Sequence, residues 1–579
     1  MTNNNKIQVK KVDVLGIKGR LTLAALLVVT IMFIIRYLDW WFQSEHIPSN
    51  WKNSPLQFLD YLLFSILSFV IFLGTFLKLG TWFAIWHMAK PKYIAPRDGI
   101  KVAFVTCYVP GSEPVEMLRK TLIAMKNVRY PHDTWVLDEG NSPEVIELTK
   151  EIGVYHFSRK DVEIYNQQHG KFKIKTKAGN LNSWQHAHGD EYEIVAQIDM
   201  DNIPHPDILI RTIGYFDDKS IGFVGIPQVY GNTHNWISKG ASEQTHLFYG
   251  PVQQGFYGCN MPFLIGNAHI YRSEALKSMD GYVSHISEDH ITGLHFYSNK
   301  WKGVYVSENL AEGEGPLTWQ DYFNQQLRWS YGLFDVLFKH SYKHFPKMPW
   351  KQRINYFFAQ LFYFTGIASS LGFLLITLYF IFGINTANMD LNEWLNYFLP
   401  PFILSHIIHV YIHKYYINPK KEPIFGFLGM FLGQAANLIY TFAFIQFILG
   451  KKLTYVVTPK GENQNKVDNS MIIFRPFVIM LYITTISLIF GIYFNRDSIV
   501  MNFWAIHNIF MLSAIITSDS LANALMSIKS KLSNKLFTSK VIVSSIFVII
   551  NAGIFYTLLD FITRKTPQLI ATLSVVKTP

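Results

Sequence analysis

The chain has 579 residues, too many for one ordinary domain, so two or more structural units are expected. Hydrophobic residues make up 49% of the chain and charged residues only 16%, below the roughly 25% usual in soluble domains, which indicates a membrane protein. The net charge of +11 fits basic loops beside anionic lipid, and without a basic recognition helix or an aromatic-basic repeat we expect no nucleic-acid partner.

Residues 1–96 are predicted to form a cytosolic tail and two transmembrane helices. Apolar runs near 19–37 and 57–86 are each long enough to cross a hydrocarbon core of about 30 Å. Lysines in the tail, among them Lys10 and Lys11, favour a cytosolic N-terminus. The second helix then returns the chain to the cytosol.

Residues 97–345 have the pattern of a cytosolic α/β domain with interfacial helices. Short β-rich runs alternate with helix-compatible segments, which predicts a largely parallel sheet. The β-rich runs are Lys101–Thr106, Thr134–Asp138, Ile194–Asp199 and Gly222–Pro227, and the helical segments include Pro114–Met125 and Pro143–Glu151. Ligands of such sheets bind at the carboxyl ends of the strands, so the residues after each strand are the candidate site.

The remaining chain is predicted to be mainly membrane helices, two within 346–423 and three within 471–579. The apolar runs lie near 354–383, 394–417, 471–494, 501–525 and 541–563. The run at 424–450 differs, because lysines on both sides, such as Lys421 and Lys451, favour the cytosol for both ends. We expect 424–470 to form an interfacial helix and a cytosolic gating loop; an eighth span is the alternative.

A hydrophobic strand that ends in Asp199 and Asp201 is the most informative motif. Carboxylates at this spacing can both approach one hard divalent cation, which in turn bridges diphosphate oxygens. Asp138, at the end of another predicted strand, can accept hydrogen bonds from a base or a ribose, or it can cap the turn before Pro143. Lys177, followed by small residues at a helix start, suits an anionic diphosphate or a solvated helix entry.

Three later motifs are equally ambiguous when taken singly. The carboxylates of Glu288 and Asp289 can supply a general base or cap a helix. Arg328 beside Trp329 offers a guanidinium for phosphate and a flat face for a sugar ring, or ordinary packing. The third motif, which includes Thr458, lies on the predicted cytosolic loop and can close over a nucleotide diphosphate.

The order of these motifs resembles that of the membrane-integrated, processive family-2 glycosyltransferases. Asp-Glu-Gly, Lys-Ala-Gly-Asn, Asp-x-Asp, Ser-Glu-Asp, Gln-Gln-x-Arg-Trp and Tyr-x-Val-Thr-Pro-Lys follow one another over roughly residues 97–465, as in bacterial cellulose synthase catalytic subunits and related β-glucan synthases. The resemblance implies an α/β domain of the nucleotide-diphospho-sugar (GT-A-like) type, inserted in an α-helical transmembrane bundle of about seven spans plus interfacial helices. It also implies an inner (plasma) membrane location with the catalytic domain in the cytosol.

The resemblance implies a role for each motif residue. Asp289 would be the base, with Glu288 and Arg328 as further catalytic residues; Trp329 would bind the acceptor sugar. The residues implied in UDP-sugar binding are Glu113, Asp138, Lys177, Asp199, Gln325, Thr458 and Lys460. Asp199 and Asp201 would hold Mg²⁺ or Mn²⁺.

The implied reaction is inverting transfer of glucose from UDP-glucose to the non-reducing end of a growing β-glucan, coupled to translocation through the lipid bilayer. The alternatives are a chitin- or hyaluronan-like synthase that uses UDP-N-acetylglucosamine, and a non-catalytic transporter. Departures from the family pattern, such as Glu139 and Ser287, leave the linkage open between β-1,4, β-1,3 and mixed. Because only a short tail follows the last predicted span, we expect no cyclic-di-GMP domain in this chain. Accessory export subunits are compatible with this assignment.

Overall fold

The structure, a computed structural model, describes residues 7–111, 114–451, 453, 470–496 and 498–531. The chain divides into two compact units. One unit comprises Met1–Leu38, Ile71–Ser370 and Phe398–Asp468; the other comprises Asp39–Val70, Leu371–Tyr397 and Asn469–Pro579.

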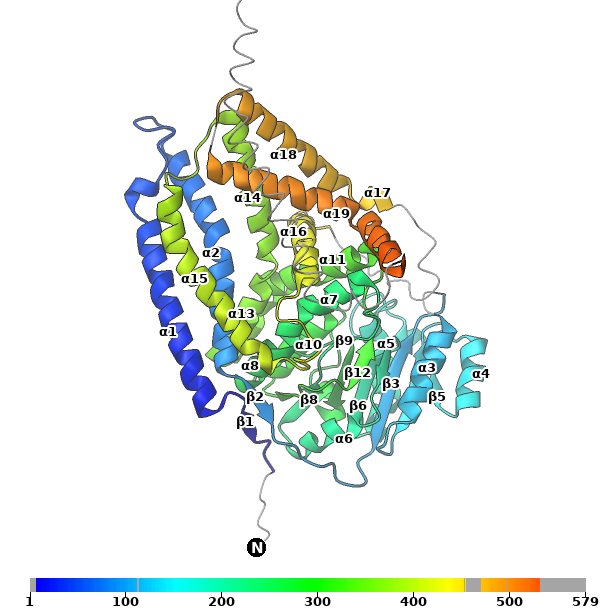
Figure 1. The fold of residues 1–579 in the computed structure, drawn as a ribbon. Coiled ribbons are helices and arrows are strands. Elements are labelled where there is room, and N and C mark those ends of the chain that lie inside the picture. The colour runs from blue at the N-terminus through cyan, green and yellow to red at the C-terminus, as the bar shows by residue number, and fades with distance from the viewer. Residues whose placement is uncertain (1–6, 112–113, 452, 454–469, 497, 532–579) are drawn as a thin grey trace, which may run out of the picture. The chain divides into compact units, whose positions relative to one another are not determined.

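A seven-stranded mixed sheet forms the centre of the first unit (Figure 1). In spatial order its strands are β11 (Lys302–Tyr305), β8 (Ile221–Gly225), β10 (Ala268–Arg272), β6 (Ile194–Asp199), β3 (Val102–Tyr108), β4 (Asp133–Asp138) and β5 (Tyr155–Phe157). All neighbouring pairs are parallel except those of β10, which runs antiparallel to both β6 and β8. The predicted α/β domain with a largely parallel sheet is therefore confirmed.

Helices cover both faces of this sheet, which explains why its strands are hydrophobic almost without interruption. On one face, Phe104 of β3 packs with residues of α3 (Val115–Lys126) and α4 (Pro143–Ile152). On the other face, Val105 packs with residues of α5 (Lys177–His188) and α10 (Glu288–Ser298). Each face of the sheet therefore has its own hydrophobic core, and the strands with their carboxyl ends lie between the helices of the two faces.

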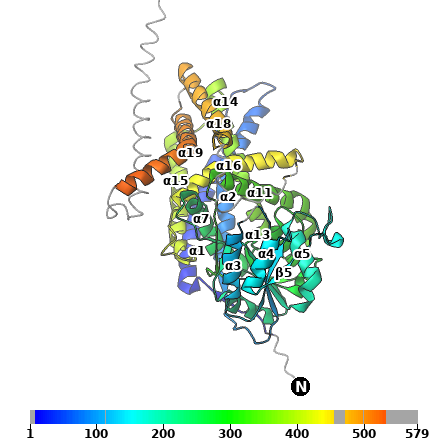
Figure 2. The same ribbon diagram turned by 90° about the vertical axis from the view of Figure 1, so that its right-hand side faces the viewer.

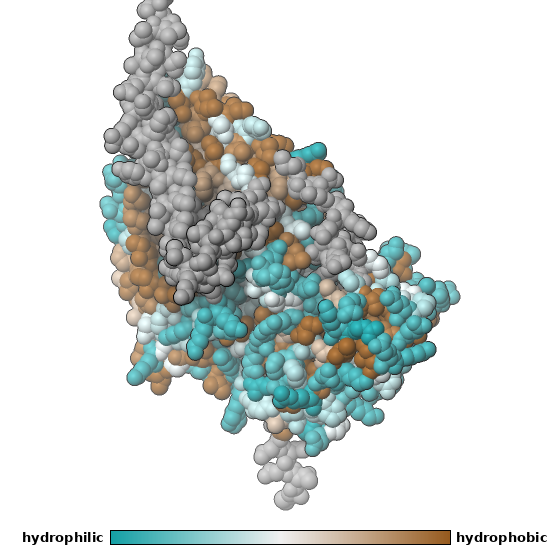
Figure 3. All heavy atoms as spheres, turned by 45° about the vertical axis from the view of Figure 1, so that its right-hand side comes forward, coloured by the Kyte–Doolittle hydropathy of each residue, from teal (hydrophilic) through white to brown (hydrophobic). Residues whose placement is uncertain are grey.

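A second, three-stranded sheet begins immediately after Asp201. It contains β7 (Asn202–Pro204), β12 (Ala311–Gly313) and β9 (Val229–Tyr230), with β12 in the middle. Figure 3 shows that hydrophilic residues predominate on the surface of the α/β domain, whereas hydrophobic residues gather over the apolar helices.

Seven helices in the described part of the chain are long and apolar enough to cross a membrane. They are Gly16–Trp41, Phe58–Trp86, Phe364–Phe382, Leu391–Tyr415, Phe427–Ile448, Arg475–Tyr493 and Ile499–Ser518. These helices support the prediction of a membrane protein. The predicted run at 541–563 lies outside the described residues.

Within the first unit, residues of α1 (Gly16–Trp41), α2 (Phe58–Trp86) and α15 (Leu391–Ile412) share one apolar core that includes Leu23, Ile85 and Ile408. Helix α16 (Phe427–Ile448) instead packs along α7 (Trp236–Leu247) and α11 (Trp319–Asp335). Figure 2 shows α16 lying across the direction of α1. An interfacial helix at 424–450 would have this orientation, and its depth in the bilayer stays a prediction.

The second unit contains the paired helices α18 (Arg475–Tyr493) and α19 (Ile499–Lys531). Phe380, from α14 (Phe364–Phe382), packs with Leu488 and Ala505 in its core. Arg496 donates a hydrogen bond to the carbonyl oxygen of Phe380 at 2.6 Å.

Candidate active site

The carboxyl ends of three adjacent strands bring two of the predicted carboxylates to one edge of the sheet. In the register of β3 with its neighbours, Tyr108 pairs with Asp138 of β4, and Cys107 pairs with Asp199 of β6. Residues that are 61 positions apart in sequence therefore end neighbouring strands on either side of β3. This is the edge at which ligands of such sheets bind.

Lys177 lies at the first turn of α5 and points to this edge. The helix begins there because the Thr176 side chain accepts a hydrogen bond from the backbone N–H of Gly179. The Lys177 ammonium contacts the Asp199 carboxylate, and it donates to the carbonyl oxygen of Gly266 at 2.7 Å. Burial disfavours the charged ammonium, but attraction to Asp199 and Glu288 outweighs burial and raises the pKa of Lys177.

Asp199 and Asp201 have the chemistry of a hard-cation site. Carboxylate oxygens are ligands that Mg²⁺ and Mn²⁺ prefer in proteins. The Asp199 side chain is 37% exposed, and it also accepts from the Gln197 amide at 3.1 Å. Asp201 accepts from the Asn202 amide at 2.8 Å and lines a cavity of about 960 Å³. Both side chains therefore border open space at the end of β6, as a metal-diphosphate site requires.

Glu288 and Asp289 lie partly buried in the first turn of α10, and Asp289 lies beside Gly266. The His290 backbone N–H donates to Asp289 at 2.7 Å. Burial raises the pKa of the Asp289 carboxyl despite this hydrogen bond. Burial and the adjacent Asp289 charge also raise the pKa of Glu288. A raised pKa makes a carboxylate a stronger base, which suits proton abstraction.

Gly266 joins these two charged parts of the site. Its carbonyl oxygen accepts from Lys177, while a Cβ added at this position would lie 2.9 Å from Asp289 Oδ2. In the sequence, Gly266 ends the stretch Phe263-Leu-Ile-Gly. No residue in that stretch indicates that Gly266 contacts Asp289.

Asp138 is fully buried, and its carboxylate accepts hydrogen bonds from the backbone N–H groups of Gly140 at 2.9 Å and Ser142 at 2.5 Å. These bonds match the turn-capping alternative, and a contact with a base stays a prediction. The neighbouring Glu139 binds Arg159 through both carboxylate oxygens, at 2.9 and 2.6 Å. Sequence reasoning missed Arg159, because no motif marks it.

Helix α11 carries the Gln-Gln-x-Arg-Trp motif. Gln325 donates to Tyr230 Oη at 3.3 Å, and the adjacent Gln326 accepts from Tyr440 Oη of α16 at 2.7 Å. Arg328 and Trp329 are half-buried on the same helix. The predicted ligand-binding residues Glu113, Thr458 and Lys460 lie outside the described residues.

The chain is similar to a glycosyltransferase family model and to several curated glycosyltransferases. Residues 194–417 match the family model described as glycosyl transferase family group 2. The chain is 24% identical over 539 residues to a UDP-forming cellulose synthase catalytic subunit from Pseudomonas fluorescens. This match covers 88% of this chain and 68% of the relative. A corresponding subunit from Komagataeibacter sucrofermentans is 23% identical over 330 residues, 55% of this chain and 41% of that relative. The chain thus spans about two thirds of the first relative and less than half of the second.

One similar solved structure is that of a mannosyltransferase from Pyrobaculum calidifontis in complex with GDP-Man and Mn²⁺. Its TM-score is 0.48 and its sequence identity is 13%, and the match covers 67% of this chain and 100% of that chain. Residues 194–417 therefore resemble a family-2 glycosyltransferase domain, and the similarity to the cellulose synthase subunit from Pseudomonas fluorescens extends over most of the chain. The predicted family resemblance is therefore confirmed, as is the GT-A-like domain joined to apolar helices.

Proposed function

We propose that this chain is a processive polysaccharide synthase, which transfers glucose from UDP-glucose to the non-reducing end of a growing β-glucan and passes the polymer across the inner membrane. The observation that carries this proposal is the convergence of Lys177, Asp199 and Asp289, from three separate motifs, around Gly266. Similarity to UDP-forming cellulose synthase subunits supports the donor and the product.

In the proposed reaction, Asp289 takes the proton of the acceptor hydroxyl while the hydroxyl oxygen attacks the anomeric carbon. The new carbon–oxygen bond forms opposite the bond to the diphosphate, whose electron pair leaves with UDP, so the anomeric configuration inverts. General-base assistance of this kind is worth roughly 10²–10⁴-fold. Lys177 and Arg328 offset the charge on the departing diphosphate, which is mainly an electrostatic contribution.

Asp199 and Asp201 are the residues that would hold Mg²⁺ or Mn²⁺. A bound divalent cation would supply further charge neutralisation at the diphosphate. The Lys177 ammonium, already in contact with Asp199, holds that carboxylate at the strand end, next to Gly266.

The remaining predicted residues complete the proposed substrate path. Trp329 stacks the acceptor sugar, and Gln325, four residues earlier on α11, lies on the same side of that helix. Asp138 contacts the uracil end of the nucleotide. In this arrangement the catalytic domain faces the cytosol, α16 lies at the membrane interface, and Thr458 and Lys460, outside the described residues, are assigned to donor binding.

Sugar-nucleotide turnover by the purified protein tests this proposal. The full chain in detergent is given UDP-glucose or UDP-N-acetylglucosamine with Mn²⁺, and UDP release is measured with each donor alone and in competition. We expect release with UDP-glucose and a polymer that linkage-specific glucanases degrade. Release with UDP-N-acetylglucosamine alone would favour a chitin- or hyaluronan-like synthase, and no release with any donor would favour a transporter.

A further inference from the structure

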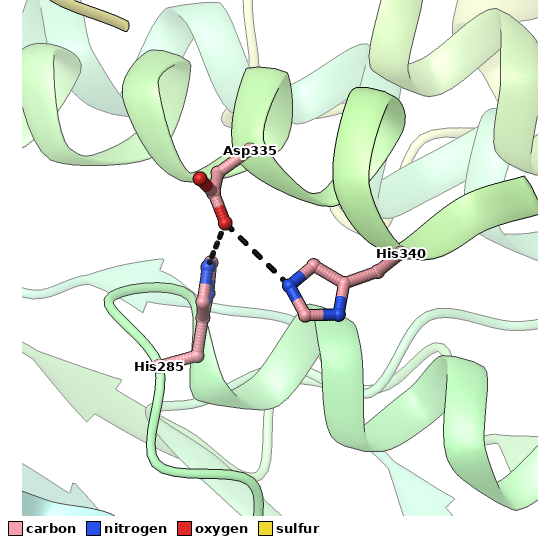
Figure 4. A group of neighbouring side chains, drawn as sticks. All are labelled: His285, Asp335 and His340. Atoms are coloured by element: carbon pink, nitrogen blue, oxygen red, sulfur yellow. Dashed lines mark hydrogen bonds and ion pairs between the residues drawn. The ribbon is translucent and has the colours of Figure 1, made fainter. Parts of the chain in front are cut away.

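A cluster of polar side chains links the end of α11 to the segment just before Glu288. The Asp335 carboxylate accepts a hydrogen bond from His285 Nε2 at 2.9 Å, and the same oxygen lies 3.5 Å from His340 Nε2 (Figure 4). Lys339 donates to the other Asp335 oxygen at 2.5 Å. Asp335 is buried, with 8% of its surface exposed, so this carboxylate is committed to its protein partners.

The second ring nitrogen of His285 fixes the tautomer of its imidazole. His285 Nδ1 accepts the backbone N–H of Ser287 at 3.0 Å. In a neutral imidazole only one nitrogen carries the proton, so the proton is on Nε2 and points to Asp335. A cation held between His285, Asp335 and His340 would need the lone pair of that same nitrogen. The hydrogen bonds therefore favour a bridge between two segments over a cation site.

Tight packing joins the same two segments. A Cβ added at Gly332 of α11 would overlap Ser287 Oγ, so no side chain fits between them. Ile286 packs against the apolar cluster that includes Tyr331 and Phe334 of α11. After Asp335 the helix continues as a π-helix over Val336–His340, and its i to i+5 bonding explains how His340 reaches back to Asp335.

We propose that Asp335 and His285 are positioning residues, which hold Arg328 and Trp329 of α11 in register with Glu288 and Asp289. Arg328 lies seven residues before Asp335, about two helical turns away. The His285 ring holds the Ser287 amide, and Ser287 is the N-cap residue from which Glu288 and Asp289 follow. This cluster therefore joins the segment that carries the base to the helix that carries the phosphate- and acceptor-binding groups. This inference rests on the proposed function.

Substitution of Asp335 tests the connection in the full-length protein in detergent. Asp335→Ala should lower kcat for UDP release on the order of 10- to 100-fold, because small misplacements of reacting groups are costly. The KM for the donor and the affinity for UDP should change by less than kcat does, because Lys177, the other diphosphate-binding group, makes its contacts outside this cluster. Asp335→Asn, whose amide oxygen still accepts from His285 Nε2, should recover most of kcat.

Two further variants separate positioning from folding. Lys339→Met removes the more exposed partner of the same carboxylate and should leave kcat within about twofold of wild type. If Asp335→Ala does not fold, His285→Asn replaces it, because asparagine can still accept the Ser287 amide but does not reach Asp335. This variant should also lower kcat by more than it changes the affinity for UDP.

Hydrogen–deuterium exchange gives a readout that does not depend on turnover. Residues 283–289 should exchange faster in Asp335→Ala than in wild type, and Asp335→Asn should restore slow exchange. Unchanged exchange, or wild-type kcat in Asp335→Ala, would overturn this inference and leave the proposed function intact. One transition-metal ion per wild-type chain, lost in Asp335→Asn, would also overturn it and assign the cluster to a cation. Failure of the proposed function itself would appear separately, as no UDP release by the wild type.

Discussion

Gly266→Ala is a direct perturbation of the distance between the base and the phosphate-binding lysine. The added Cβ would lie 2.9 Å from Asp289 Oδ2, whereas ordinary contacts begin near 3.4 Å. The carboxylate must therefore retreat by about 0.5 Å to restore a normal contact. The hydrogen bond from the His290 N–H at 2.7 Å limits how it can rotate away.

The magnitude follows from the size of this displacement. A misplacement of about 1 Å can cost about 100-fold, so half that distance should lower kcat by about 10-fold. Overpacking should also lower the free energy of unfolding by about 1–3 kcal/mol. The affinity for UDP should be preserved, because Lys177 and the Gly266 carbonyl group are both retained.

Steady-state UDP release and calorimetric UDP binding measure the two effects separately. Gly225→Ala is the matched control, because a Cβ there meets its nearest neighbour, the carbonyl oxygen of Phe263, at an ordinary 3.4 Å. This control should keep kcat within about twofold of wild type. A Gly266→Ala protein with wild-type kcat would refute the argument that Asp289 must stay in its observed position.

Three further predictions address the metal, the nucleotide edge and the buried acid. Asp201→Asn should raise the Mn²⁺ concentration for half-maximal UDP release by about 10-fold or more, and EDTA should abolish release by the wild type; an unchanged titration would exclude Asp201 as a ligand. Arg159→Met should lower the free energy of unfolding by about 3 kcal/mol, because it removes both hydrogen bonds that the guanidinium donates to the Glu139 carboxylate; an unchanged denaturant midpoint would contradict this. The pKa of Glu288 is raised from 4.5 to about 7, so its contribution to stability is present at low pH and is lost as the pH rises through 7. In metal-free protein, wild type should therefore lose more stability between pH 5 and 8 than Glu288→Gln does; parallel pH profiles would contradict the shift.

The sequence was sufficient to predict the parallel part of the sheet. The run predicted at Ile194–Asp199 is strand β6 without any change, and the run at Thr134–Asp138 differs from β4 by one residue. Helix α4 likewise begins at the predicted Pro143. These elements were predictable because strands buried on both faces are hydrophobic throughout, and because turn residues bound them clearly.

The antiparallel strand β10 and the small sheet were not predictable in the same way. Strand β10 inserts between β6 and β8, and its partner residues lie more than 40 positions away, so no local pattern marks its direction. The small sheet has strands of two or three residues, too short to show a period.

The motif residues were predictable, but not the contacts that hold them. Lys177 and Asp199 were both expected at the diphosphate, and the structure brings them into contact. Gly266, by contrast, acquires its role only through the chain fold, which places Asp289 against it. His285 and Asp335 are 50 residues apart, and nothing in either local sequence pairs them.

The most direct test of the proposed mechanism is the activity of Asp289→Asn, measured beside wild type as UDP release from UDP-glucose with Mn²⁺ and as UDP binding. Asparagine keeps the shape of the side chain and removes its basicity. We predict that transfer falls by about 100-fold or more while the affinity for UDP stays close to that of wild type. Substantial turnover by Asp289→Asn would contradict its assignment as the general base.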